Sequence, residues 1–165
     1  VDLIGKLYKN SLTVGVSRTE FFLAKSVVLA SIALMQILVS LFIAFVPATM
    51  LNGLGTMPEG FIGNLLLTIA LQFLCLLAWL SIVSFILYVT HSYLAVFIGY
   101  LITSILLSMP MLIFPDIEIL RYLSLNFAYA MTDYSQAVLY TVIVTVTIIL
   151  LFTVSGLAVF KKKSL

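Results

Sequence analysis

Residues that could carry chemistry are few in this sequence, and they do not gather into a motif. The chain has one histidine, His91, and one cysteine, Cys75, so it can assemble neither a His-x-x-x-His nor a Cys-x-x-Cys metal site. It has no glycine-rich loop that ends in Lys-Ser or Lys-Thr, and therefore no motif for cradling a phosphate. We expect no catalytic residue, no bound cofactor or metal, and a protein that is not an enzyme.

The composition indicates a chain whose solvent is lipid. Hydrophobic residues make up 64% of the 165 residues and charged residues only 8%, whereas a soluble domain carries roughly 25% charged residues. The apolar runs are long and unbroken, which favours helices over barrel strands, because barrel strands alternate apolar and polar residues. We predict an all-α fold, a polytopic membrane helical bundle. The net charge of +2 is too small to indicate nucleic acid as a partner.

Four apolar stretches are long enough to cross a bilayer, which takes about 20 helical residues. They predict spans at about 27–46, 65–89, 94–114 and 137–160, and none of these ranges contains Lys, Arg, Asp or Glu. We expect Pro47 to close the first span, and the glycines and proline of residues 48–63 predict a flexible loop. The chain then divides into an N-terminal segment, residues 1–25, and a transmembrane domain, residues 26–165.

The basic residues give the orientation of these spans. Seven of the eight lie before the first span or after the fourth, and Arg121 alone lies between spans. The seven are Lys6, Lys9, Arg18, Lys25, Lys161, Lys162 and Lys163. The positive-inside rule then places both termini in the cytoplasm of a multi-pass protein of the cell membrane. Residues 91–93 form a short turn on the same side, so the second and third spans should form an antiparallel hairpin, with His91 at the membrane interface.

The N-terminal segment predicts a short amphipathic helix, a turn and the start of a membrane helix. Its apolar residues follow a 3.6-residue period: Leu3, Ile4, Leu7, Tyr8 and Leu12. Gly15 is a plausible stop for this first helix. Ser17 and Glu20 then match the capping box, in which each side chain bonds to the other residue's backbone N–H. A new helix should therefore start near Arg18 and run into the first span.

The loop before the fourth span, residues 115–135, is more apolar than the earlier loop. It predicts a short helix lying on or dipping into the membrane, with one apolar face made of Ile117, Leu120, Leu123, Phe127 and Met131. Asp133, three positions before Gln136, indicates the start of the fourth span.

The polar residues within the spans are uncharged, and this bears on mechanism. Those that we expect to be buried are Gln36, Gln72, Ser81, Ser84, Thr103, Ser104, Thr141, Thr145 and Thr147. We expect them to hydrogen-bond between helices rather than to contact a substrate. Ion-coupled carriers usually bury a charged or ionisable residue at mid-membrane, so such a carrier is disfavoured. Energy for any transport should then come from a partner protein.

The stretch from Gly5 to Lys25 resembles the cytoplasmic segment between the second and third membrane helices of ABC-2-type transporter permeases. The resemblance lies in a basic amphipathic stretch, a Ser-Arg turn, an aromatic run and a final lysine. The residues that carry it, and that the resemblance implies for coupling to an ATPase, are Gly5, Lys6, Lys9, Asn10, Ser17, Arg18, Glu20 and Lys25. The alternative is that these residues only anchor a helix at the lipid surface.

What this resemblance implies is a six-span subunit of which the present chain, starting at Val1, is an N-terminally truncated fragment containing spans three to six. Such a subunit pairs with a second permease copy or a homologous permease and docks a separate, cytoplasmic ABC ATP-binding subunit. We expect it to export an amphipathic or lipid-like substrate. The alternative is a non-transporting polytopic membrane module, such as an assembly factor or a sensor anchor.

Overall fold

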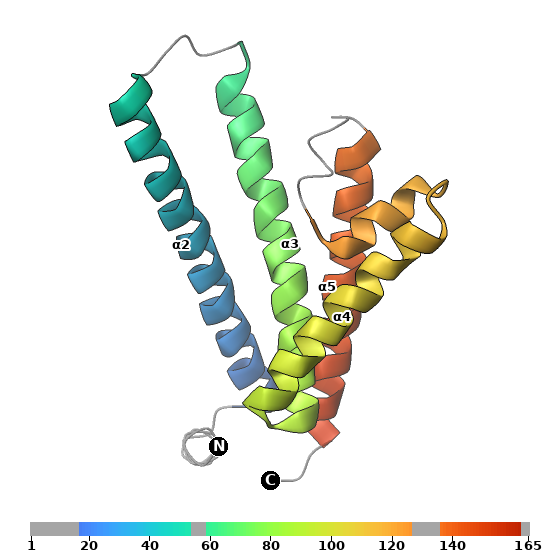
Figure 1. Cartoon of the computed structure of the whole chain (residues 1–165). Helices are drawn as coiled ribbons and strands as arrows, with labels where there is room; N and C mark the ends of the chain where they lie inside the picture. The colour runs from blue at the N-terminus through green and yellow to red at the C-terminus, as the bar shows by residue number, and fades with distance from the viewer. Residues whose placement is uncertain (1–16, 54–58, 127–135, 163–165) are drawn as a thin grey trace.

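The computed structural model describes residues 17–53, 59–126 and 136–162 of the chain. It contains four long helices, α2 (Arg18–Asn52), α3 (Phe61–Thr90), α4 (Tyr93–Ile113) and α5 (Gln136–Lys162), and one short 3-10 helix, η1 (Glu118–Ser124). Each long helix is long and apolar enough to cross a membrane. The predicted all-α membrane bundle is confirmed, and four candidate spans are those of a multi-pass membrane protein (Figure 1).

The first long helix extends further than the sequence predicted. We expected Pro47 to close it, but Pro47 lies inside α2, which continues to Asn52. Proline removes one backbone donor, and apolar helices tolerate this when nearby groups bond to the backbone. The N–H that Pro47 lacks would have bonded to the Ile43 carbonyl, and the Thr49 hydroxyl, which donates to the Val46 carbonyl at 2.9 Å, does not replace it. Gly53, at φ 72°, ends the helix by donating its N–H to the Thr49 carbonyl at 2.9 Å. Since α3 begins at Phe61, the predicted loop over residues 48–63 is too long at both ends.

The predicted hairpin between the second and third spans is confirmed, with a turn of two residues. His91 takes the left-handed conformation, at φ 52°, and its N–H donates to the Leu87 carbonyl at 2.9 Å. Ser92 then caps α4, because its hydroxyl accepts from the Ala95 N–H at 3.4 Å. From this turn α4 leans away from α3, so the pair opens like a V (Figure 1).

The two arms of this hairpin touch where Gly99 faces Ile86. A Cβ atom placed on Gly99 would meet side-chain atoms of Ile86 at 3.1 Å and 3.2 Å. We expect Gly99→Leu to force the arms apart and to destabilise the fold by about 1–3 kcal/mol, as overpacking does. Thermal unfolding in detergent measures this, with Gly63→Leu as the control, since no atom lies within 4 Å of a Cβ there. Equal melting temperatures for the two variants would contradict the prediction.

The core lies between α3, α5 and the segment around η1. It contains Ala78, Ile82, Tyr122, Leu125, Ala137 and Val144. Thr141 and Thr145 are also buried, yet their hydroxyls donate to carbonyls of their own helix, at 2.8 Å to Ala137 and 2.7 Å to Thr141. Ser81 and Thr147 do the same. The expectation that these four side chains bond between helices was wrong, because a hydroxyl reaches a carbonyl one turn back without any partner helix.

The sequence predicted a short helix before α5, and η1 is such a helix. Its fully buried residues, however, differ from those of the predicted apolar face. Tyr122 and Leu125 are the residues that it buries, while Ile117 is 48% exposed. A 3-10 helix repeats every three residues, so positions 122 and 125 fall on one side. Leu120 and Leu123 of the predicted face, also three residues apart, are half-buried, and Leu123 packs against the core. The other members of the predicted face, Phe127 and Met131, and the predicted start at Asp133 lie outside the described residues.

Candidate functional site

The structure describes half of the predicted coupling residues. Gly5, Lys6, Lys9 and Asn10 lie outside the described residues. Ser17, Glu20 and Lys25 are described, and Arg18 is the first residue of α2, although its side chain lies outside the described part. The described part of the site is therefore the beginning of α2 and its surroundings.

The capping box at the start of α2 is present as predicted. The Glu20 N–H donates to the Ser17 hydroxyl at 3.2 Å, and the Ser17 N–H donates to the Glu20 carboxylate at 2.8 Å. Two backbone donors that the first helical turn would leave unpaired are thereby satisfied. The box fixes the residue at which α2 begins.

Loss of this cap should fray the start of α2. We expect Ser17→Ala to reduce the local stability of the first turn by about 1 kcal/mol, the usual cost of removing such a cap. Hydrogen exchange of the amides of residues 19–21 should then speed up by roughly fivefold. Ser31→Ala is the matched control, because the Ser31 hydroxyl only donates to the Val27 carbonyl within the helix. Unchanged exchange in the Ser17 variant would show that the box does not hold this end.

Four aromatic rings join the start of α2 to the ends of α3 and α5. We call them the aromatic joint: Phe21, Phe22, Tyr88 and Phe160. The ring of Phe22 lies 5.4 Å from that of Tyr88 and 6.0 Å from that of Phe160, and the latter two are 5.4 Å apart. Phe21 stacks on Phe160 at 6.4 Å. Phe22 is only 4% exposed, so it is the centre of the joint.

Lys25, the last residue of the predicted coupling set, lies against this joint. Its ammonium is 4.7 Å from the centre of the Phe21 ring, a cation–π geometry. Lys25 follows Phe21 by four residues, so both lie on the same side of α2. The aromatic run and the lysine that the sequence singled out are therefore in contact.

The sequence did not predict Tyr88 and Phe160 as parts of this site. A signal existed: Phe22 comes shortly before the first predicted span, Tyr88 lies near the end of the second and Phe160 ends the fourth. Helices that alternate in direction bring these three positions to one end of the bundle (Figure 1). What the sequence lacks is the information that α2, α3 and α5 are the helices that meet there.

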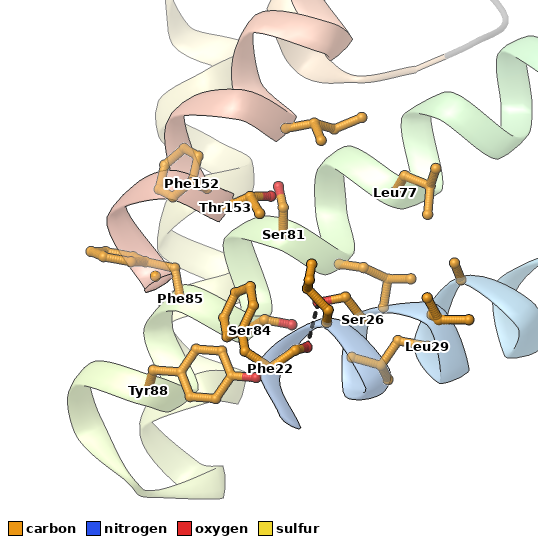
Figure 2. Close-up of a pocket in the computed structure, with 16 residues that line it drawn as sticks. Phe22, Ser26, Leu29, Leu77, Ser81, Ser84, Phe85, Tyr88, Phe152 and Thr153 are labelled. Atoms are coloured by element: carbon orange, nitrogen blue, oxygen red, sulfur yellow. Dashed lines mark hydrogen bonds between the residues drawn. The ribbon is translucent and has the colours of Figure 1, made fainter. Parts of the chain in front are cut away.

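A cavity of about 270 Å³ opens next to the joint, between α2, α3 and α5. Figure 2 shows Phe22, Phe85 and Phe152 on its walls, with the hydroxyls of Ser84 and Thr153 beside them. The lining residues are Phe22, Leu23, Ser26, Val27, Leu29, Ala30, Leu77, Leu80, Ser81, Ser84, Phe85, Tyr88, Ile149, Phe152, Thr153 and Gly156. None is charged, so the cavity is apolar with a few hydroxyl groups.

Two of these hydroxyls bond to their own helices. Ser26 donates to the Phe22 carbonyl at 3.0 Å and Ser81 to the Ala78 carbonyl at 2.7 Å. The sequence had singled out Ser81 and Ser84 among the polar residues of the spans but not Ser26 or Thr153. The cavity thus offers apolar surface and weakly polar oxygen atoms, which suit an uncharged or amphipathic molecule.

Across residues 17–53, 59–126 and 136–162, no three His, Cys, Asp or Glu side chains come together as they would around a metal ion. In comparisons with family models, with curated proteins and with solved structures, nothing matches this chain. The function proposed below therefore depends on the residues and the geometry of this chain.

Proposed function

We propose that this chain belongs to the membrane-spanning permease subunit of an ABC-2-type transporter. In this proposal, both of its ends lie in the cytoplasm, and a separate ATP-binding subunit supplies the energy. The permease pairs with a second copy or a homologous permease and exports an amphipathic or lipid-like substrate. Residues 3–16 form the contact with the ATP-binding subunit, and α2 carries its movement into the membrane.

The observation that carries the proposal is the continuity of α2. Its 35 residues correspond to about 52 Å at 1.5 Å per residue, well beyond the roughly 30 Å of a hydrocarbon core. The first two turns, with Arg18, Glu20 and Lys25, therefore extend to the membrane surface. Because the helix is unbroken from the capping box onward, a displacement of the segment before Ser17 moves the first span directly.

The aromatic joint and the cavity support a role in moving a substrate. α2 packs against α3 and α5 at its beginning, where Phe22 is buried. Towards its other end, the axis of α2 diverges from that of α3 (Figure 1). After Ile37, none of the described side chains of α2 is buried. A helix that is fixed at one end can tilt about that end. Since α2 forms one wall of the cavity, a tilt would change the cavity's width.

Co-purification tests this function. The tagged protein, extracted from its native membrane in a mild detergent, should bring with it a protein in which mass spectrometry finds a P-loop and the other motifs of an ABC ATPase. A tagged, unrelated multi-pass protein from the same membrane serves as the control. Recovery of no ATP-binding subunit in several detergents would overturn the proposal and would favour a non-transporting membrane module.

A further inference from the structure

Two hydroxyl groups in the cavity between α2, α3 and α5 differ from their neighbours on its walls. Ser26 and Ser81 donate to carbonyls of their own helices. The hydroxyls of Ser84 on α3 and Thr153 on α5 have no hydrogen bond within the part of the chain that the structure describes (Figure 2). Because a hydroxyl in apolar surroundings is less stable without a hydrogen bond, these two groups are available to a molecule in the cavity.

The polarity of the cavity changes along its length. Its serine and threonine hydroxyls lie within seven positions, about two helical turns, of Phe22, Tyr88 or Phe160 in the aromatic joint. The lining residues further from the joint are all apolar: Ala30, Leu77, Leu80, Ile149 and Phe152. Because α2 begins at the joint whereas α3 and α5 end there, this apolar end points towards the middle of the membrane. A lipid has the same gradient, with oxygen atoms near the surface and hydrocarbon below them.

The size of the cavity fits one hydrocarbon chain. Its volume is about 270 Å³. Since a cavity of about 150 Å³ holds one benzene molecule, this volume has room for roughly a dozen carbon atoms. Along α3 the lining extends from Leu77 to Tyr88, which corresponds to about 16 Å at 1.5 Å per residue, or about half of a hydrocarbon core roughly 30 Å thick. The cavity thus has the depth of one leaflet.

A further membrane span cannot occupy this space, although one can lie across its mouth. A helix with its side chains is about 10–12 Å across, and packed helices have axes about 8–10 Å apart. α2 contacts both α3 and α5, and Phe22, Tyr88 and Phe160 join the three helices at the aromatic joint. No room for a whole helix remains between them at this level, so the occupant is narrower than a helix.

We propose that the cavity binds a single hydrocarbon chain that begins with an uncharged oxygen group, such as the ester of a monoacylglycerol. Ser84 and Thr153 donate to oxygen atoms of this group, and the chain lies along Leu77, Leu80 and Ile149. None of the described lining residues is charged, so an ionised group would lose its hydration there without gaining a partner. The ligand enters from the leaflet in which α2 begins. Its role as the exported substrate rests on the proposed function.

Photolabelling of the purified protein in phosphatidylcholine vesicles tests this site. The probe is a monoacylglycerol with a diazirine near the end of its chain, which on irradiation becomes attached to residues that it touches. We expect label on Leu77, Leu80 or Ile149 that an excess of unlabelled monoacylglycerol displaces. An alkane with the same diazirine should label these residues about tenfold less, because it lacks the two hydrogen bonds. The corresponding fatty-acid anion should also label them less, because of its charge.

Variants that remove one hydroxyl each test the role of the polar end. Ser84→Ala and Thr153→Val change the volume little, and each should weaken the displaceable labelling by about fivefold, as expected for one hydrogen bond. Thr147→Val is the control on α5. Thr147 is exposed outside the cavity, and its hydroxyl donates to the Ile143 carbonyl at 2.7 Å, so this variant should bind the probe like the wild-type protein.

A variant that fills the apolar end tests the place of the chain. Ala30→Phe puts a ring into the cavity and should abolish the displaceable label, whereas Ala44→Phe, at an exposed position of α2 outside the cavity, should retain it. Melting temperatures in detergent show whether both variants are folded. If Ala30→Phe does not fold, the comparison of Ser84→Ala and Thr153→Val with the wild-type protein decides the result.

The outcomes separate the inference from the proposed function. Label that excess monoacylglycerol does not displace, or labelling that is unchanged in Ser84→Ala and Thr153→Val, would overturn the site even if an ATP-binding subunit co-purifies. Displaceable label on a protein with which no ATP-binding subunit co-purifies would support the site and count against the transporter. With the subunit present, monoacylglycerol should speed ATP hydrolysis by the wild-type complex but not by the Ala30→Phe complex. Equal rates with and without monoacylglycerol in the wild-type complex would overturn its role as substrate.

Discussion

Replacement of both Lys6 and Lys9 by glutamate is expected to abolish ATP-driven transport while the protein stays in the membrane. The proposed contact places these lysines against the ATP-binding subunit. Charge reversal turns attraction into repulsion, and like charges across an interface cost several kcal/mol. At 1.4 kcal/mol for each tenfold, that corresponds to a loss of affinity on the order of a hundredfold. Transport and ATP hydrolysis by the co-purified complex, measured together in proteoliposomes, report the effect.

The matched control is the double variant Lys162→Glu and Lys163→Glu. It reverses the same number of charges on the same predicted side of the membrane but outside residues 3–25. We expect transport near the wild-type level for this variant. If both double variants lose transport equally, the loss reflects net charge near the membrane rather than contact with the ATPase. Unchanged transport in the Lys6 and Lys9 variant would remove the coupling role of the segment.

Phe22→Ala should loosen α2 from the rest of the bundle. The ring of Phe22 makes two of the contacts in the aromatic joint, with Tyr88 and with Phe160. Within lipid the hydrophobic transfer term is small, so the main loss is that of the ring contacts, about 0.5–1.5 kcal/mol each. The expected destabilisation is about 1–3 kcal/mol, visible as a lower melting temperature in detergent. Transport should fall with it, because α2 would no longer be fixed at its start.

Phe42→Ala is the control for this prediction. Phe42 belongs to the same helix but is 68% exposed, so its ring has little protein to lose contact with. The Phe42→Ala variant should therefore unfold close to the melting temperature of the wild-type protein. An equal drop for the two variants would mean that the loss of any phenylalanine from α2 destabilises the protein, and that the joint has no special role.

Local rules predicted much of this fold. The lengths of the apolar runs predicted the four long helices and their order along the chain. This is possible because a helix exposed to lipid needs only about 20 apolar residues and a backbone whose hydrogen bonds lie within the helix. The capping box at Ser17 and Glu20 and the turn at His91 were predicted from neighbouring residues, and both are confirmed. These features depend on contacts between residues that are close in the sequence.

Features that depend on distant contacts were not predictable in the same way. Pro47 reads as a helix end, but α2 continues past it to Asn52 and ends where the Gly53 N–H donates to the Thr49 carbonyl. The face of η1 depends on how Tyr122 packs in the core with α3 and α5, which no local period reveals. The aromatic joint needs three helices to meet, and sequence spacing alone does not say which three. In the proposed function, the contribution of Lys6 and Lys9 depends on a second protein altogether.

Site-specific photo-cross-linking tests the central claim, coupling of this segment to an ATPase, most directly. The photoreactive residue p-benzoylphenylalanine is placed at Lys9, and at Arg121 as the control on the predicted opposite side of the membrane. After irradiation in native membranes, we predict that the Lys9 position becomes joined to an ABC ATP-binding subunit, identified by its P-loop peptide, and that the Arg121 position does not. Cross-links from Lys9 only to lipid or to this chain, with no ATP-binding subunit among the products, would contradict the account.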